Sequence, residues 1–170
     1  MYVLETSPEF QFFASSRCRL DGIESLGNGR FRLGLKRLPE IFKNMIRKYC
    51  EDELPANIHS FAEKKGFRVG RVTLGPDLVW IDRSSFPAFH PKSRCHVLLA
   101  VAPPVQTGDP ATNASARTML TIRSQKDESK NVDIEWHVGY VYMLEEGEVA
   151  QVSDGDFAFI GIQYATRPVS

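Results

Sequence analysis

Apolar residues recur at the spacing of an amphipathic helix over residues 38–49. Positions three or four residues apart share one helical face, and that stripe consists of Leu38, Ile41, Phe42, Met45, Ile46 and Tyr49. Pro39 suits the first turn, and the acidic run at 51–53 followed by Pro55 ends the element. A shorter helix is predicted at about 56–65, with Gly66 as its stop.

Alternating or continuous apolar runs predict strands on both sides of this helical pair. Before it, residues 11–20 and 30–35 are expected to be strands, with a turn at Gly27-Asn28-Gly29 between them. After it, strands are predicted at 67–74, 78–82, 96–102, 118–123, 132–144, 149–152 and 157–166. The run 96–102 is continuously apolar, as in a central strand. Gly75-Pro76-Asp77 is predicted to be a turn and residues 145–148 a hairpin turn.

This order of elements predicts an α+β fold. We expect a largely antiparallel β-sheet of five to seven strands, with two helices from the N-terminal half of the chain packed on it. A doubly wound nucleotide-binding fold would need helices and strands to alternate, and they do not. A chain of 170 residues suits one domain, residues 1–170, with a helical insert at about 38–65 and a β-rich part at about 67–170.

The composition is that of an ordinary globular protein, with 42% hydrophobic and 25% charged residues. No apolar run approaches the roughly 18 residues of a membrane span, so no transmembrane segment is expected. The first residues lack the pattern of a signal peptide. Cys18, Cys50 and Cys95 match neither a disulfide framework nor a metal-binding pair. We therefore expect a cytoplasmic or nuclear protein with reduced thiols that is not secreted.

Charge is distributed unevenly along a chain whose net charge is zero. Residues 1–97 carry 16 basic and 11 acidic residues, whereas residues 98–170 carry 5 and 10. A molecule with opposite poles can attract a polyanion or a second copy of itself. The chain is therefore expected to form homo-oligomers.

The basic excess is concentrated in residues 17–48, where nine basic residues accompany three acidic ones. The predicted polyanion-binding residues are Arg17, Arg19, Arg30, Arg32, Lys36, Arg37, Lys43, Arg47 and Lys48. If the strand and helix faces that carry them adjoin, they form one patch for RNA, a nucleoprotein or an anionic membrane surface. The alternative is a solvated face that only keeps the protein soluble.

Residues 103–116 have no hydrophobic periodicity and are predicted to form a long exposed loop. The residues predicted to mediate self-association are Pro103, Pro104, Val105, Gln106 and Pro110. Their proline-rich start favours an extended conformation that could lie in a neighbour's groove. A flexible tip without a partner is the alternative.

No motif identifies a reaction, and neither a metal nor a cofactor is predicted. His90 and Cys95 are too few for a zinc site, and nothing in the spacing selects Cys95 and His137 as a nucleophile and its base. The enzymatic alternative is a small nuclease or toxin-like enzyme. It would use Glu135 and His137 on one strand face, with Arg123 as a neighbour.

Several segments carry a resemblance to a known family. They are the stretch from Phe10 to Leu20, the segment Arg30-Phe31-Arg32-Leu33, the helix at 38–49, and a sheet interrupted by the proline-rich residues 103–116. This order resembles the matrix proteins of rhabdoviruses. The resemblance implies an α+β core that inserts an exposed loop into a neighbour's pocket and bridges nucleocapsid and membrane. The chain lacks that family's Pro-Pro-x-Tyr motif, because Gln106 stands where the tyrosine would be. We expect a non-enzymatic structural or assembly protein.

Overall fold

The structure is a computed structural model. It describes residues 1–16, 24–27, 30–81, 88–89, 95–104, 118–124, 127–154 and 157–169. The described helices are α1 (Pro8–Ser15), α2 (Glu40–Asp52) and α3 (Leu54–Lys65), with a short 3-10 helix η1 (Leu35–Arg37). The described strands are β1 (Tyr2–Glu5), β2 (Glu24–Gly27), β3 (Arg30–Gly34), β4 (Phe67–Ile81), β5 (Ala88–Phe89), β6 (Cys95–Ala100), β7 (Thr118–Ser124), β8 (Asp127–Trp136), β9 (Tyr140–Leu144), β10 (Glu148–Asp154) and β11 (Phe157–Pro168).

The described strands form two antiparallel sheets. The large sheet has seven strands in the order β1-β9-β6-β11-β4-β3-β2, and the small sheet has four in the order β5-β10-β7-β8. The predicted α+β class is therefore confirmed, and β6 is a central strand buried along its whole length, as its apolar run indicates. No helix in the described part of the chain has the length and apolar character needed to cross a membrane.

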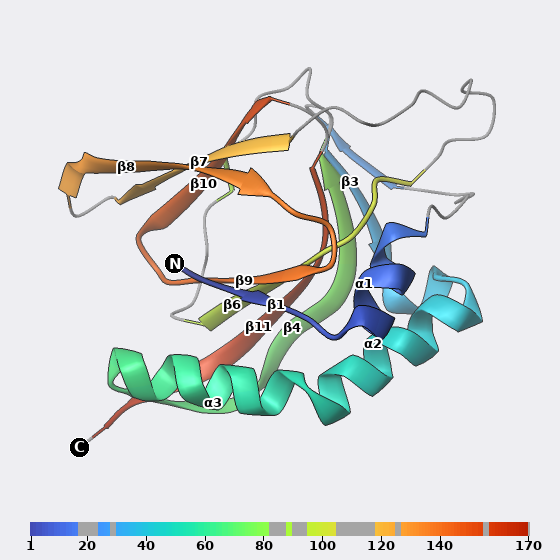
Figure 1. The fold of residues 1–170 in the computed structure, drawn as a ribbon, viewed down its shortest axis with the longest axis horizontal. Coiled ribbons are helices and arrows are strands. Elements are labelled where there is room, and N and C mark those ends of the chain that lie inside the picture. Colours follow the sequence, from blue (N-terminus) through green and yellow to red (C-terminus); the bar gives the residue numbers. More distant parts are fainter. Residues whose placement is uncertain are drawn as a thin grey trace.

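Each face of the large sheet covers a separate hydrophobic core. The helices pack on one face, where Ile46 of α2, Phe61 of α3 and Ile160 of β11 belong to one buried cluster. The small sheet packs on the other face, where Trp136 of β8 meets Phe157 of β11. Figure 1 shows the helices, the large sheet and the small sheet as successive layers. β6 and β11 contribute side chains to both cores, because successive residues of a strand point to opposite faces of the sheet.

Residues 8–15 form a helix, so the strand predicted at 11–20 is wrong for its described part. Pro8 occupies the first turn, and the Ser7 hydroxyl accepts a hydrogen bond from the Phe10 backbone N–H at 3.4 Å. Phe10, Phe13 and Ala14 are buried together, which is the spacing of one helical face. Residues 17–20 lie outside the described part of the chain.

Helix α2 confirms the predicted amphipathic stripe with one exception. Ile46 and Tyr49 are buried, and Phe42 and Met45 pack partly buried against the same core. Ile41 is 67% exposed, so its predicted burial is wrong. At 100° per residue, Ile41 lies about 90° from the centre of the buried stripe, at its border with the polar face.

Helix α3 ends as predicted. Gly66 adopts a left-handed conformation with φ of 69°, and its N–H caps the last turn. The helix starts at Leu54, earlier than expected, because Pro55 is tolerated in the first turn.

Two predicted strand boundaries are wrong. Gly75-Pro76-Asp77 is not a turn, because β4 runs through it and pairs with β11 on both sides. A Cβ atom on Gly75 would lie 2.2 Å from the Gly161 carbonyl oxygen, so this close approach requires glycine. The strand predicted at 132–144 is divided by a turn in which Gly139 has φ of 88°, and its two halves, β8 and β9, belong to different sheets. Residues 145–148 do form a turn, but it connects the two sheets rather than a hairpin.

Candidate functional site

Among the described basic residues, Arg32 lies on a different face of the large sheet from Lys43 and Arg47. Arg32 lies directly opposite Val79, which packs in the core between the two sheets. The neighbouring residue Leu33 packs in the core beneath the helices. Arg32 therefore points away from α2, whose face carries Lys43 and Arg47. The expectation of one contiguous patch is wrong for these residues, because the register of β3 separates them.

Several of the same residues have acidic or polar partners. Arg32 Nε donates to Asp77 Oδ2 at 3.1 Å, and Lys43 Nζ donates to Glu40 Oε2 at 3.1 Å. Lys48 Nζ donates to both carboxylate oxygens of Glu9 at 2.9 Å.

The remaining basic residues divide into two groups. Arg47 Nη1 lies 3.5 Å from Asn44 Oδ1, and Lys36 and Arg37 are exposed in η1. Arg17, Arg19 and the side chain of Arg30 lie outside the described part of the structure.

The start of the predicted self-association loop is anchored to the core. Pro103 is half-buried and Pro104 is buried, so the expectation of full exposure is wrong for these two. The reason is that the chain is still attached to α1 here, since the Ala102 N–H donates to the Ala14 carbonyl at 2.8 Å. Val105, Gln106 and Pro110 lie outside the described residues.

The residues of the enzymatic alternative do not converge. His137 follows the end of β8 and lies in the turn to β9, with its ring 5.2 Å from that of Tyr140. The Tyr142 hydroxyl accepts the His137 backbone N–H at 2.8 Å and donates to the Glu135 carbonyl at 3.2 Å. Arg123 pairs with Asn131, four residues before Glu135. At strand rise this separation is about 13 Å.

Of the two described thiols, Cys95 is fully buried and Cys50 is half-buried. Burial raises the pKa of Cys95 to about 12 and that of Cys50 to about 11. The adjacent His96 is 5% exposed, and burial lowers its pKa to about 4. Burial therefore disfavours the thiolate form of both cysteines and the imidazolium form of His96. Among the described residues, no three His, Cys, Asp or Glu side chains form a group that could hold a metal ion.

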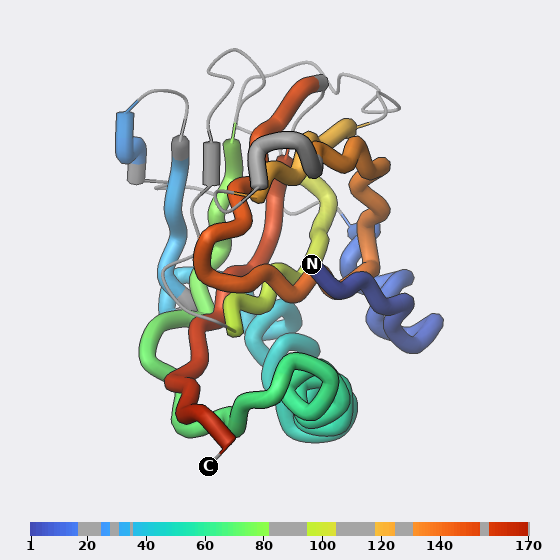
Figure 2. The backbone as a smooth tube through the Cα atoms, turned by 90° about the vertical axis from the view of Figure 1, so that its left-hand side faces the viewer, coloured from blue at the N-terminus to red at the C-terminus, as the bar shows by residue number. Residues whose placement is uncertain are grey.

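A groove lies between α3 and the ends of β4 and β11. It has a volume of about 760 Å³ and a mostly apolar lining, a size typical of ligand and peptide pockets. Ile58 and Ala62 line it from α3, and Val69, Val72 and Tyr164 line it from the strands. Figure 2 shows this part of β4 and β11 leaving the body of the large sheet beside α3.

The groove exists because the neighbouring strands stop early. β3 pairs with β4 only from Asp77 onward, and β6 pairs with β11 only as far as Tyr164. Beyond these points β4 and β11 continue as a two-stranded ribbon. The rings of Phe67 and Phe61 pack edge to face, with 5.6 Å between their centroids, and this contact holds the end of the ribbon on α3.

The β4 half of this ribbon has an open edge. No described strand pairs with residues 67–74 on the side away from β11. Val72 is 46% exposed and Leu74 is 47% exposed, and every residue from 70 to 74 is exposed. A strand edge of this kind presents unpaired N–H and C=O groups to another chain.

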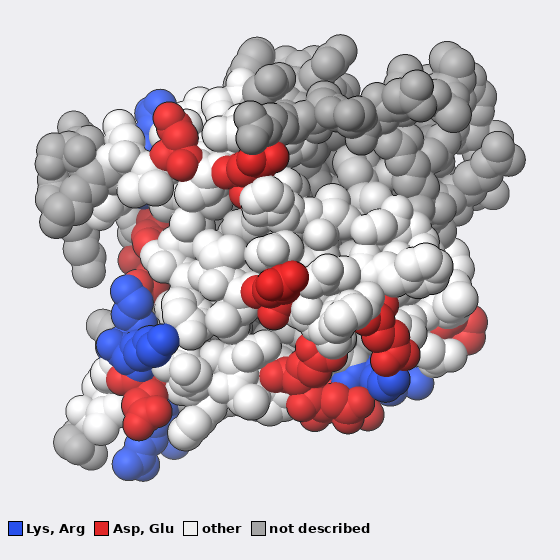
Figure 3. Space-filling model, in the orientation of Figure 1, with Lys and Arg blue, Asp and Glu red and all other residues white. Residues whose placement is uncertain are grey.

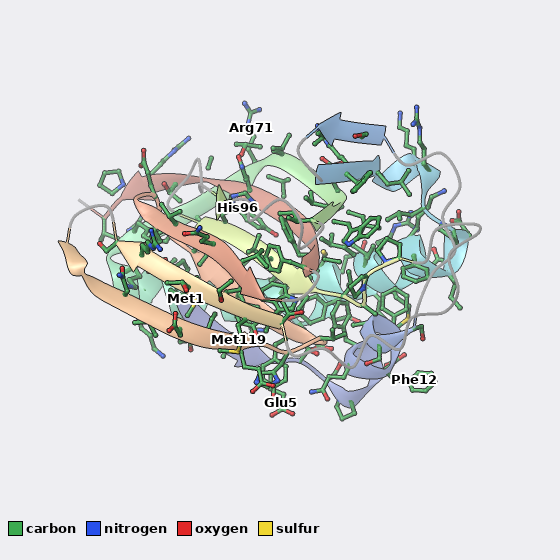
Figure 4. The ribbon with its side chains drawn as sticks, turned by 90° about the horizontal axis from the view of Figure 1, so that it is seen from above. Met1, Glu5, Phe12, Arg71, His96 and Met119 are labelled. Carbon is green, nitrogen blue, oxygen red and sulfur yellow. The ribbon has the colours of Figure 1, made fainter. Side chains whose placement is uncertain are left out.

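Arginines surround this open edge. Arg68 of β4 lies directly opposite Arg167 of β11, and like charges in that position repel. None of the ion pairs between described residues includes Arg68, Arg71 or Arg167. Figure 4 shows the Arg71 side chain pointing away from the body of the protein. In Figure 3, Lys and Arg side chains gather where α3 ends and the C-terminus lies, with acidic side chains among them.

Sequence reasoning missed this site. The available signal was the pair Arg68 and Arg71 within an otherwise apolar, β-branched run that ends at Leu74. Comparison of the chain with protein-family models, curated proteins and solved structures found no match.

Proposed function

We propose that this chain is a non-enzymatic assembly protein that associates with copies of itself and binds a polyanionic surface. The observation that carries the proposal is the open β4 edge at residues 67–74, with Val72 and Leu74 half-exposed beside an apolar groove. Exposed edges recruit other strands, and charged side chains on an edge, such as Arg68 and Arg71 here, restrict that pairing to partners of opposite charge. An edge left open in this way suits a protein whose working form is an assembly.

The polyanionic partner in this proposal is RNA, a nucleoprotein or an anionic membrane surface. The exposed residues available to it are Lys36 and Arg37 in η1 and Arg47 on α2. Lys43 and Lys48 contribute less, because each already neutralises a carboxylate. Such a protein would work in the cytoplasm or the nucleus, which is part of the proposal.

The resemblance to rhabdovirus matrix proteins supports a second contact between copies. In this version of the proposal, residues 103–116 of one copy enter a pocket of the next. The groove beside α3 has the volume for several side chains of an extended segment. The residues that would enter it, Val105, Gln106 and Pro110 among them, lie outside the described part of the chain.

The nuclease alternative has less support. General acid–base catalysis requires the participating groups to lie within hydrogen-bonding reach of one substrate. Arg123 is about 13 Å along the sheet from Glu135, and His137 lies beyond the end of the strand.

The decisive experiment measures particle size by light scattering over a range of salt concentrations, alone and with RNA or anionic liposomes. We expect assemblies at low salt that become smaller as salt rises, because charges are screened over about 10 Å at 0.1 M. RNA or anionic liposomes should increase the particle mass. A protein that remains monomeric at low salt and high concentration, with and without these partners, would rule out the proposed function.

A further inference from the structure

We infer that the open edge of β4 in one copy pairs with the open edge of β8 in the next copy. This inference rests on the proposed self-association and names the two surfaces that would form it. Among the described strands, β8 is the last strand of the small sheet and pairs only with β7. Both edges are long enough for stable pairing, with eight residues free on β4 and ten on β8.

The two edges carry opposite charge. The open part of β4 contains Arg68 and Arg71 and no acidic residue. β8 contains four acidic residues and one basic residue, Lys130. Asp133 is exposed on β8, and Val132 beside it is 53% exposed. Charge complementarity therefore favours β4 against β8.

The same charges disfavour pairing between identical edges. Two β4 edges would bring arginines together, and two β8 edges would bring carboxylates together, and both arrangements repel. The other edge strands of the large sheet, β1 and β2, have four residues each and offer a shorter contact. A pairing between unlike edges is therefore the favoured arrangement.

One antiparallel register matches both faces of the two strands. It sets Arg68 opposite Glu135 and Val69 opposite Ile134. The next pairs are Arg71 with Asp133 and Val72 with Val132. The two arginines are three residues apart and the two carboxylates only two. The extra residue is absorbed by the bulge in β4, where Val69 pairs with Thr166 and Val72 pairs with Tyr164.

This register separates the chemistry by face. Alternation along β4 sets Val69 on the opposite face from Arg68 and Val72 on the opposite face from Arg71, and Arg68 also borders the groove. Along β8, Val132 and Ile134 alternate with Asp133 and Glu135. The apolar pairs fall on one face of the joined strands and the ion pairs on the other. Because the two edges are different surfaces of the same chain, the contact is heterologous, and repeated contacts form rings or filaments.

Charge reversal in two separate variants tests the inference. One variant is Arg68→Glu/Arg71→Glu, which makes both edges acidic. The other is Asp133→Lys/Glu135→Lys, which makes both edges basic. Each alone should raise the apparent dissociation constant of assembly by about tenfold or more, since like charges at an interface repel. An equimolar mixture should restore assembly, because each β4 then meets a β8 of opposite charge.

The control is Glu51→Lys/Asp52→Lys, which reverses the same number of charges at exposed positions of α2, outside both edges, and should assemble as wild type does. A thermal melt of each variant verifies folding. If a reversed variant does not fold, the pair Val72→Cys and Val132→Cys replaces it. The proposed register predicts an intermolecular disulfide under mild oxidation in the mixture and not in either variant alone.

The outcomes separate the two proposals. A wild-type protein that never assembles overturns the proposed function together with this inference. If both reversed variants assemble as strongly as wild type, the β4–β8 pairing is overturned and self-association still stands. The same conclusion follows if both variants fold but their mixture does not assemble. The pairing is also overturned if wild type assembles but the mixture of the Val72→Cys and Val132→Cys variants forms no intermolecular disulfide.

Discussion

Ser7 and Glu53 join the start of α1 to the junction between α2 and α3. The Ser7 hydroxyl donates to Glu53 Oε1 at 2.5 Å, and the Ser7 N–H donates to Glu53 Oε2 at 3.2 Å. The same hydroxyl caps α1. One carboxylate therefore holds the cap of the first helix against the corner of the other two, and the three helices depend on one another.

Removing this carboxylate should loosen the helical layer. We expect Glu53→Ala to reduce the free energy of unfolding by about 1–2 kcal/mol, since it removes two half-buried hydrogen bonds to a charged group. Urea denaturation measures the effect. The control is Glu51→Ala on the exposed face of α2, where a change within about 0.5 kcal/mol is expected. Equal destabilisation of the two variants would contradict the role of the Ser7 contact.

The border of the buried stripe on α2 provides a second test. Ile46 is 1% exposed and Ile41 is 67% exposed, so the same residue type samples both environments on one helix. Ile46→Ala should lower stability by about 2–5 kcal/mol, because less apolar surface is buried and a cavity remains. Ile41→Ala should change it by less than about 0.5 kcal/mol. A large destabilisation at Ile41 would mean that a partner or a neighbouring copy covers this residue.

The helical pair was predictable because its signals are local. A stripe at helical spacing, Pro55 and the left-handed stop at Gly66 depend only on nearby residues. Helix α1 was missed because Phe10 and Phe12 are two residues apart and Phe13 follows them, which suggests the two-residue period of a strand. Ser7-Pro8 followed by apolar residues at 10, 13 and 14 gives a helix instead, with Phe12 81% exposed. Figure 4 shows Phe12 pointing outward from α1.

The site was less predictable because it depends on pairing between distant segments. The charge count over residues 17–48 is correct, but it cannot reveal that Arg32 lies opposite Val79 and faces away from α2. Likewise, Arg68 and Arg167 are 99 residues apart in sequence and become neighbours only through the β4–β11 register. The open edge of β4 also follows from pairing, because β3 pairs with β4 only between Arg30 and Gly34.

Stability should depend on pH through His96. This residue is buried beside Gln163, with His96 Nδ1 and Gln163 Nε2 at 3.2 Å. Burial lowers the pKa of His96 from 6.5 to about 4. Between these two values the unfolded chain binds more protons than the folded protein, so stability is full above about pH 6.5 and falls as the pH drops toward 4.

A comparison of two variants isolates this contribution from that of the carboxylates. On going from pH 7 to pH 5, wild type should lose about 2 kcal/mol more than His96→Gln, because glutamine does not titrate. Urea denaturation at both pH values gives the difference. Parallel destabilisation of the two proteins would show that His96 is protonated without cost in the folded state.

Polyanion binding should depend on the helical side and not on the strand side. We expect Lys36→Ala/Arg37→Ala/Arg47→Ala to flatten the log–log salt dependence of RNA binding by about 0.7–0.9 for each phosphate-binding side chain removed. Arg32→Ala should leave that slope unchanged, because Arg32 points to the opposite face and is engaged with Asp77. Unchanged binding to RNA and to anionic liposomes in the triple variant would identify these residues as a solvated face.

Replacing Val105–Ala114 with a short Gly/Ser linker tests whether this segment holds copies together. The linker begins after Pro104, so it keeps that buried proline and the hydrogen bond from Ala102 to Ala14. The fold and melting temperature should therefore be nearly unchanged. Contacts between charged edges weaken as salt rises, whereas an apolar segment inserted into a pocket resists salt. We expect the variant to lose the assemblies that survive high salt and to keep those that form only at low salt. Light scattering at low and high salt measures the two kinds of assembly separately. A thermal melt is the control for folding. Assemblies that persist at high salt without this segment would show that it is not the salt-resistant contact.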